Sequence, residues 1–131
     1  MAKGIVYSKK NPLLRWLVDE GCWLVEEELS AFWNDIPFKV GIGFKTDLAS
    51  IPRALRSLIP QVGKHIQAAI FHDLIYRARY DSILSKKHWG LSRSQADNML
   101  LDGMKYSGVG YMKRYAIYWG VRSGGMFSWE D

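Results

Sequence analysis

Apolar and polar residues alternate in the first third of the chain, a pattern typical of β-strands with one buried face. Leu14, Trp16 and Val18 alternate with other residues, and an apolar run resumes at Cys22. The residues between them, 19–21, read Asp-Glu-Gly and have the composition of a turn. We therefore expect a β-hairpin in this region.

The same alternation continues further along the chain. Phe38, Val40, Ile42 and Phe44 alternate with lysine and glycine, so we expect a third strand over residues 38–45. The two glycines weaken such a strand and allow a bulge or a close approach of another backbone. Together with the hairpin, this strand predicts an antiparallel sheet of about three strands.

After the predicted sheet, the spacing of apolar residues becomes helical. Pro52 and Pro60 interrupt residues 46–60, which we expect to form an ordered loop with one short helical turn. From residue 63 to about residue 80, apolar positions cover much of the helix circumference. This distribution is expected of a central helix that is buried on several sides.

Two further helices are predicted in the last third of the chain. Ser92 and Gln95 have the spacing of a capping box, so a second helix is expected from there to about residue 106. A third covers residue 111 to about residue 122, and its aromatic residues have the helical spacing that is common in cores. The prediction is a single α+β domain, with an N-terminal antiparallel sheet followed by three helices.

Composition and charge narrow the class of protein. The chain has 131 residues, a size suited to one domain with its own core. Aromatic residues make up 14% of it, including six tryptophans, so we expect some rings to face a partner. The net charge of +5 suits an anionic partner, but the basic residues are spread along the sequence, and a nucleic-acid groove is therefore not favoured over a solvated surface.

Cysteine content and hydropathy exclude several other classes. The single cysteine, Cys22, allows neither an intrachain disulfide nor a cysteine-rich zinc site. The sequence contains no stretch of about 18 apolar residues, so no transmembrane segment is predicted. The N-terminus does not resemble a secretory leader, so we expect synthesis in the cytoplasm.

The strongest candidate for chemistry is the dipeptide His72-Asp73, because it interrupts an apolar helical stretch. On a helix these two side chains point about 100° apart, while Tyr76 lies one turn beyond both. A histidine acting as general base needs an acceptor from another element, and Asp97 on the next helix is the candidate. The alternative is that His72 and Asp73 are buried polar struts bonded to backbone groups.

A second candidate segment follows the predicted sheet. Asp47 and Ser50 cap a loop or helix start in one interpretation. In the other, Asp47 joins Asp73 as a ligand of a divalent ion, while Ser50 and Arg53 bind substrate. Because the donors are mostly carboxylates, the predicted ion is Ca²⁺ or Mg²⁺ and not zinc.

The two remaining histidines are weaker candidates. His65 lies near the start of the predicted central helix and is expected to be exposed, and His88 lies in a charged loop.

Three ordered motifs resemble a domain-of-unknown-function family of bacteriophage and prophage proteins. They are Gly-Phe-Lys-Thr-Asp-Leu-Ala-Ser-Ile-Pro-Arg at residues 43–53, Ala-Ala-Ile-Phe-His-Asp-Leu-Ile-Tyr at residues 68–76, and Ala-Asp at residues 96–97. The similarity extends over roughly residues 13–104. It implies a phage origin and does not imply a settled activity.

The string His72-Asp73-x-x-Tyr76 also resembles the active-site helix of secreted and parvoviral phospholipases of the A type. In that family the histidine activates water, the adjacent aspartate binds calcium, and a later aspartate orients the histidine. These roles would fall to His72, Asp73 and Asp97. The chain departs from the family in lacking a disulfide framework and a glycine-rich calcium loop shortly before the histidine.

The leading hypothesis is a phage-encoded hydrolase that acts on a lipid or polymer of the bacterial envelope during entry or lysis. The alternative is a noncatalytic virion component, such as a small tail or baseplate protein, whose polar cluster is structural and whose surface binds other virion proteins. Either protein is made in the host cytoplasm, and the second is incorporated into the virion. A third hypothesis, a basic regulator of host nucleic acid, requires a contiguous positive face that the sequence does not show.

Overall fold

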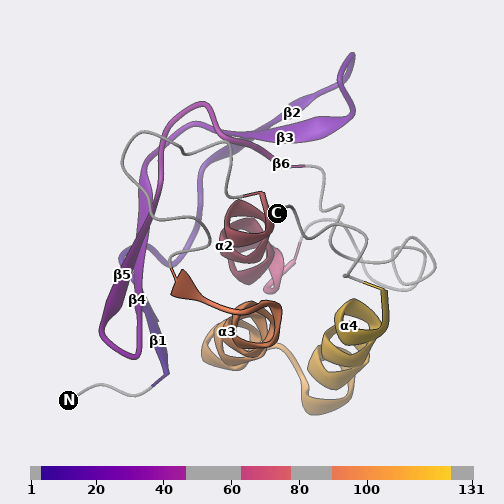
Figure 1. Cartoon of the computed structure of the whole chain (residues 1–131). Helices are drawn as coiled ribbons and strands as arrows, with labels where there is room; N and C mark the ends of the chain where they lie inside the picture. Colours follow the sequence, from indigo (N-terminus) through magenta and orange to yellow (C-terminus); the bar gives the residue numbers. More distant parts are fainter. Residues whose placement is uncertain (1–3, 47–62, 78–89, 125–131) are drawn as a thin grey trace.

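Strands fill the first part of the chain and helices the second, as the computed structural model in Figure 1 shows. The structure describes residues 4–46, 63–77 and 90–124. Within these ranges there are two three-stranded antiparallel sheets, followed by three helices. The predicted α+β class, with an N-terminal antiparallel sheet and three helices after it, is confirmed.

The first sheet has the strand order β1-β4-β5. Its strands are β1 (Ile5–Tyr7), β4 (Leu29–Trp33) and β5 (Ile36–Val40). Alternate side chains of each strand are buried, so one face of the sheet packs on the core and the other faces solvent. Neither β1 nor β4 was predicted as a strand from the sequence.

A two-residue turn joins β4 to β5. Its residues, Asn34 and Asp35, have φ values of 50° and 69°, and Trp33 pairs with Ile36 across the hairpin. Positive φ at both positions is the requirement of a type I′ turn, which asparagine and aspartate tolerate. This dipeptide is therefore a local signal for the hairpin that the alternation alone did not reveal.

The second sheet has the order β2-β3-β6. It contains β2 (Leu14–Leu17), β3 (Cys22–Val25) and β6 (Lys45–Thr46). The predicted hairpin is confirmed, because Leu17 pairs with Cys22 at the end of a turn in which Gly21 has a φ of 65°. Trp16 and Trp23 face each other across it, with ring centroids 5.0 Å apart.

The predicted third strand over residues 38–45 is wrong as a single element. The chain leaves β5 after Val40 and turns through residues 41–44 before entering β6, so the two ends of the segment belong to different sheets. Gly43 has a φ of 97°, which a strand cannot accommodate and which glycine adopts readily. Ile42, expected on the buried face, is 73% exposed at the tip of this turn.

The central helix α2 (Ile66–Tyr76) is buried at every residue, in agreement with its predicted character. His65, which precedes it, is also buried, so the expectation that this side chain is exposed is wrong. Burial by the surrounding protein lowers the pKa of His65, and the nearby positive charge of Lys113 lowers it further.

The other two helices are α3 (Arg93–Tyr106) and α4 (Tyr111–Gly124). The predicted capping box is present, since the Ser92 hydroxyl accepts from the Gln95 backbone and the Gln95 side chain accepts from the Ser92 backbone. In Figure 1, α3 lies beside both α2 and α4, and it contacts each of them. Tyr111 and Trp119 on α4 are mostly exposed, so of the two interpretations of these rings, core or surface, the surface one holds for this pair.

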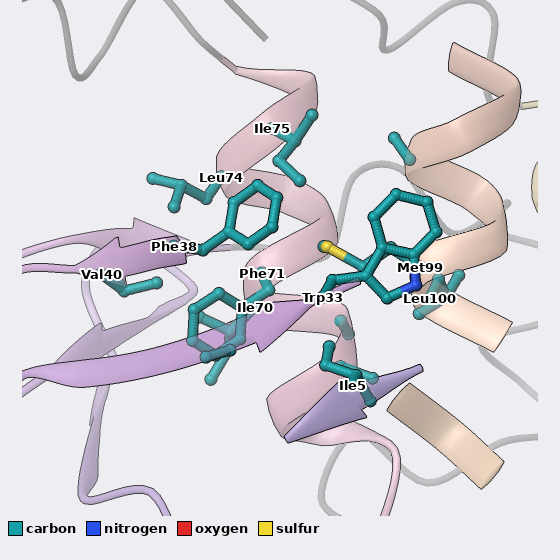
Figure 2. Close-up of a cluster of buried hydrophobic side chains, with 14 of the residues drawn as sticks. Ile5, Trp33, Phe38, Val40, Ile70, Phe71, Leu74, Ile75, Met99 and Leu100 are labelled. Carbon is teal, nitrogen blue, oxygen red and sulfur yellow. The ribbon is translucent and has the colours of Figure 1, made fainter. Parts of the chain in front are cut away.

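The core lies between the first sheet and the helices, and Figure 2 shows its side chains. Phe38 and Val40 of β5 lie beside residues of α2 such as Leu74, and the Trp33 indole of β4 lies beside Met99 of α3. Met99 and Leu100 belong to α3, which contacts both α2 and β1. The central helix thus has apolar partners in both directions, which explains why its sequence shows no polar face.

At Gly103, α3 lies close to both β1 and α2. A Cβ atom at this position would overlap the Tyr7 hydroxyl and lie 2.8 Å from Ala68 Cβ. The Tyr7 hydroxyl is buried and has no hydrogen-bond partner within the described residues. Burial raises the pKa of Tyr7, as do Tyr106 and Asp102, so its hydroxyl stays protonated.

We expect Gly103→Ala to destabilise the protein by about 1–3 kcal/mol, because a well-packed contact must be forced apart. Thermal or urea unfolding measures this loss. Tyr7→Phe alone should be close to neutral, since it removes a hydroxyl without a partner. In the double variant it should recover part of the loss, because one of the two overlapping groups is gone.

Gly110→Ala is the matched control, because a Cβ there meets nothing within 4 Å. A Gly103→Ala variant as stable as this control would contradict the close approach of the two helices.

Candidate functional site

Asp97 is a buried carboxylate in the second turn of α3. The capping box at Ser92 fixes where the helix begins, and Asp97 follows on the face that is turned to α2. Its side chain has no exposed surface. Because an ionised carboxylate away from water is costly unless it is paired, its partners determine what this site can do.

Two side chains of α2 contact the same oxygen of Asp97. His72 Nε2 lies 2.6 Å from Asp97 Oδ1, and the Tyr76 hydroxyl donates to the same oxygen over 2.5 Å. The four-residue spacing places both rings on one face of α2, with centroids 4.1 Å apart. The expected contact between His72 and Asp97 is therefore present, and Tyr76 joins it.

Two arginines approach the other oxygen. Arg122 Nη1, near the end of α4, donates to Asp97 Oδ2 over 2.7 Å, and Arg93 Nη1 lies 3.6 Å from that oxygen. Arg93 also donates to the backbone carbonyls of Val121 and Arg122. Asp97 and the four side chains around it, His72, Tyr76, Arg93 and Arg122, form what we call the Asp97 cluster.

Neither arginine of the cluster was predicted from the sequence. Arg93 stands four residues before Asp97 on one helix, a spacing that brings side chains together and was available as a signal. Arg122 is 25 residues from Asp97 in sequence. The local sequence around Arg122 or Asp97 gives no signal that these two residues are in contact.

The cluster keeps Asp97 ionised. Burial opposes its ionisation, but hydrogen bonds from His72, Tyr76 and Arg122 outweigh that effect, and the pKa of Asp97 lies below its ordinary value of 3.8. Burial and the hydrogen bond to Asp97 raise the pKa of Tyr76, so its hydroxyl remains a donor. Since an ionised carboxylate only accepts hydrogen bonds, the proton between His72 and Asp97 belongs to Nε2.

Asp73 belongs to a different contact, although it adjoins His72. Arg77 Nη1 lies 3.4 Å from Asp73 Oδ2 and also donates to the Lys45 backbone carbonyl over 3.1 Å. Asp73 is buried, and this contact connects α2 to β6. A cavity of about 410 Å³ opens beside it, between the turn at residues 41–44 and the end of α2.

The predicted metal site cannot be assembled from the described residues. They contain no group of three or more histidine, cysteine, aspartate or glutamate side chains suited to a metal ion. Asp73 faces the cation of Arg77, and its predicted co-ligand Asp47 lies outside the described residues. The Ca²⁺ or Mg²⁺ site thus stays a prediction.

Three other predicted positions also lie outside the described residues: Ser50, Arg53 and His88. Among the helices within the described ranges, none is long and apolar enough to cross a membrane.

We expect Asp97→Asn to reduce the free energy of unfolding by about 3–5 kcal/mol, because it leaves Arg122 and the other donors without their charge partner. Wild-type stability should also fall as the pH drops below about 4. The folded-state pKa of Asp97 is lowered, so its contribution is present above the unfolded-state pKa and is lost as the pH falls through the folded-state value. Urea unfolding between pH 3 and pH 7 measures both effects.

Asp19→Asn supplies the control, since Asp19 is exposed in the turn between β2 and β3. If Asp97→Asn cost no more stability than this surface change, the cluster would not hold an ionised carboxylate.

Comparison with known proteins identifies the family. The model of a family described as "protein of unknown function (DUF1353)" matches residues 23–121, well over half of the chain. Searches among curated proteins and among solved structures found no significant match. The resemblance to a domain-of-unknown-function family is confirmed, while the phage origin stays a prediction. The chain belongs to the DUF1353 family of proteins of unknown function.

Proposed function

We propose that the protein is a hydrolase in which His72 is the general base and Asp97 orients it. The observation that carries the proposal is the 2.6 Å contact between His72 Nε2 and Asp97 Oδ1, with Arg122 and Tyr76 keeping the carboxylate ionised. An imidazole whose Nε2 proton is held by a carboxylate presents Nδ1 as its basic atom. This pairing is the usual preparation of a histidine for proton transfer.

The proposed hydrolysis needs two proton transfers, one from water to His72 and one from His72 to the leaving group. His72 Nδ1 takes a proton from a water molecule as the water oxygen bonds to the carbonyl carbon of the substrate. When the bond to the leaving group breaks, the leaving oxygen or nitrogen receives that proton from the imidazole. Asp97 stabilises the positive charge that His72 carries between the two transfers.

The proposed setting is the bacterial envelope, and the proposed source is a phage. The phage source follows from the resemblance of the three sequence motifs to phage proteins. The lipid ester follows from the resemblance of the HDxxY string to phospholipases, and peptidoglycan is the alternative substrate. Ser50 and Arg53 are proposed to bind this substrate. The protein would be made in the host cytoplasm and reach its lipid or polymer substrate during entry or lysis.

We also propose that Asp73 and Asp47 hold a divalent ion, but the proton transfers by His72 do not depend on it. In the described residues, Asp73 is already paired with Arg77. No proton transfer above is therefore assigned to the ion, and comparing Ca²⁺, Mg²⁺ and EDTA in the assay tests it separately.

We expect His72→Gln to lower the hydrolytic rate by about 10²–10⁴-fold, the usual contribution of a general base. The melting temperature should stay near that of wild type, because glutamine retains a polar group that can reach Asp97. The assay follows fatty-acid release from phosphatidylglycerol and phosphatidylethanolamine vesicles and, in parallel, solubilisation of peptidoglycan. Thermal unfolding of the same samples separates catalysis from stability.

His65→Gln is the matched control, since His65 is a buried histidine beside the same helix and takes no part in the Asp97 cluster. If the activities of His72→Gln and His65→Gln both fell only in proportion to the fraction of folded protein, His72 would be a structural strut and not a general base. Absence of hydrolysis by wild type on either substrate would overturn the hydrolase proposal.

A noncatalytic virion component remains the second candidate, and two observations favour it. The side chains of His72 and Asp97 have no exposed surface, which suits a structural role. On α4, Tyr111, Met112 and Trp119 are more than 60% exposed, which suits a surface that binds another subunit.

This candidate makes a separate prediction. Quantitative mass spectrometry of purified particles should then find the protein at a fixed number of copies per particle. Its absence from particles would exclude the structural role.

A further inference from the structure

A groove of about 1020 Å³ opens at the N-terminal end of α2, and no member of the Asp97 cluster lines it. It lies between the segment that joins β1 to β2, the β3 strand and the ends of α2 and α3. Its volume is at the upper end of the range for small-molecule sites. None of the functions considered above uses it.

The charge of the groove has one sign. Lys9, Lys10 and Lys64 line it, and none of its lining residues is acidic. Lys9 is paired with Glu27 at 2.7 Å. Within the described part of the chain, Lys10 and Lys64 make no ion pair, so two positive charges remain available to an anion.

The remaining walls are largely apolar. The groove's apolar lining residues include Leu13, Leu14, Trp23 and Ile66, the first residue of α2. Leu13 is 53% exposed, whereas Leu14 and Trp23 are half-buried and Ile66 is buried. Exposed apolar surface beside unpaired lysines suits a ligand that carries both a hydrocarbon chain and a negative charge.

Gln67 adds a specific polar feature to the groove. Its side chain is 2% exposed, and its Nε2 donates to the Lys9 carbonyl over 2.9 Å. Its Oε1 is buried without a hydrogen-bond partner in the described residues. A buried acceptor without a donor is costly, and a ligand hydroxyl would supply the missing hydrogen bond.

We propose that this groove binds an anionic amphiphile with a hydroxyl-bearing headgroup, the class that includes phosphatidylglycerol. Lys10 and Lys64 bind the phosphate, Gln67 Oε1 accepts from a headgroup hydroxyl, and the acyl chains lie along Leu13, Trp23 and Ile66. The site goes beyond the proposed hydrolase function and does not depend on it, because its residues are separate from His72 and Asp97.

Isothermal titration calorimetry of the full chain tests this proposal with ether-linked dioctyl phosphatidylglycerol below its micellar concentration. The ether bonds resist ester hydrolysis, so the binding result stands whether or not the protein is a hydrolase. We expect saturable binding of this lipid, and binding of ether-linked dioctyl phosphatidylcholine that is weaker by about tenfold or more. Glycerol phosphate, which has the headgroup without the chains, should not bind measurably.

Charge-reversal variants locate the site. Lys10→Glu and Lys64→Glu should each weaken binding of the phosphatidylglycerol by about tenfold, because each removes a charge-assisted hydrogen bond. Lys39→Glu, an exposed lysine on β5 outside the groove, is the matched control and should leave the affinity unchanged.

Apolar variants complete the test. Leu13→Ser should weaken binding, whereas Val18→Ser, which alters an exposed residue outside the groove, should not. Equal affinity for the two lipids, tight binding of glycerol phosphate alone, indifference to the Lys10 and Lys64 changes, or no binding would each overturn the proposal.

Discussion

The ionised carboxylate of Asp97 is the constraint on which the arrangement of the helices depends. It accepts hydrogen bonds from His72 and Tyr76 of α2 and from Arg122 of α4, while it belongs to α3 itself. A charge in an otherwise apolar interior is tolerated only when every partner is in position. One side chain thus makes the positions of all three helices depend on one another, and such buried polar groups select one packing among several that apolar contacts alone would allow.

A second polar contact relates the central helix to the strands. Arg77, just after α2, bridges the Asp73 carboxylate and the backbone carbonyl of Lys45 in β6. Helix α2 has no polar face, so its rotation about its own axis is poorly specified by hydrophobicity. His72 and Asp73 and their partners specify it, because His72 contacts Asp97 of α3 while Asp73 contacts Arg77, which also binds β6. Both residues of the dipeptide thus make contacts between α2 and its neighbours, in addition to any chemistry that His72 performs.

The parts of the fold that follow from local sequence were predictable. The capping box at Ser92 marks the start of α3, and the turn composition before Cys22 marks the first hairpin. The prediction of one strand over residues 38–45 was wrong because the apolar alternation continues through Gly43, whose positive φ turns the chain from one sheet to the other. Alternation reports which residues are apolar and does not report where the backbone turns.

In the candidate site, too, some contacts were predictable from the sequence and others were not. The pairing of His72 with Asp97 was predictable because two helices in sequence order commonly pack together and each supplied one conspicuous polar residue. Arg122 was not, because an arginine near the end of an exposed helix is ordinary until its partner is known. His65 was predicted to be exposed because its sequence neighbour Lys64 is charged. It is buried because of tertiary contacts, which the local sequence does not show.

The pairing of the strands bears on which part of the chain can stand alone. The family match begins at residue 23, inside β3, and so omits β1 and β2. Yet β1 is hydrogen-bonded to β4, and β2 to β3. A fragment cut at the family boundary would leave one side of both β4 and β3 as open edges, and open edges recruit strands from other molecules. The strand pairing of both sheets thus extends beyond the stretch that the family model matches, back to Ile5 of β1.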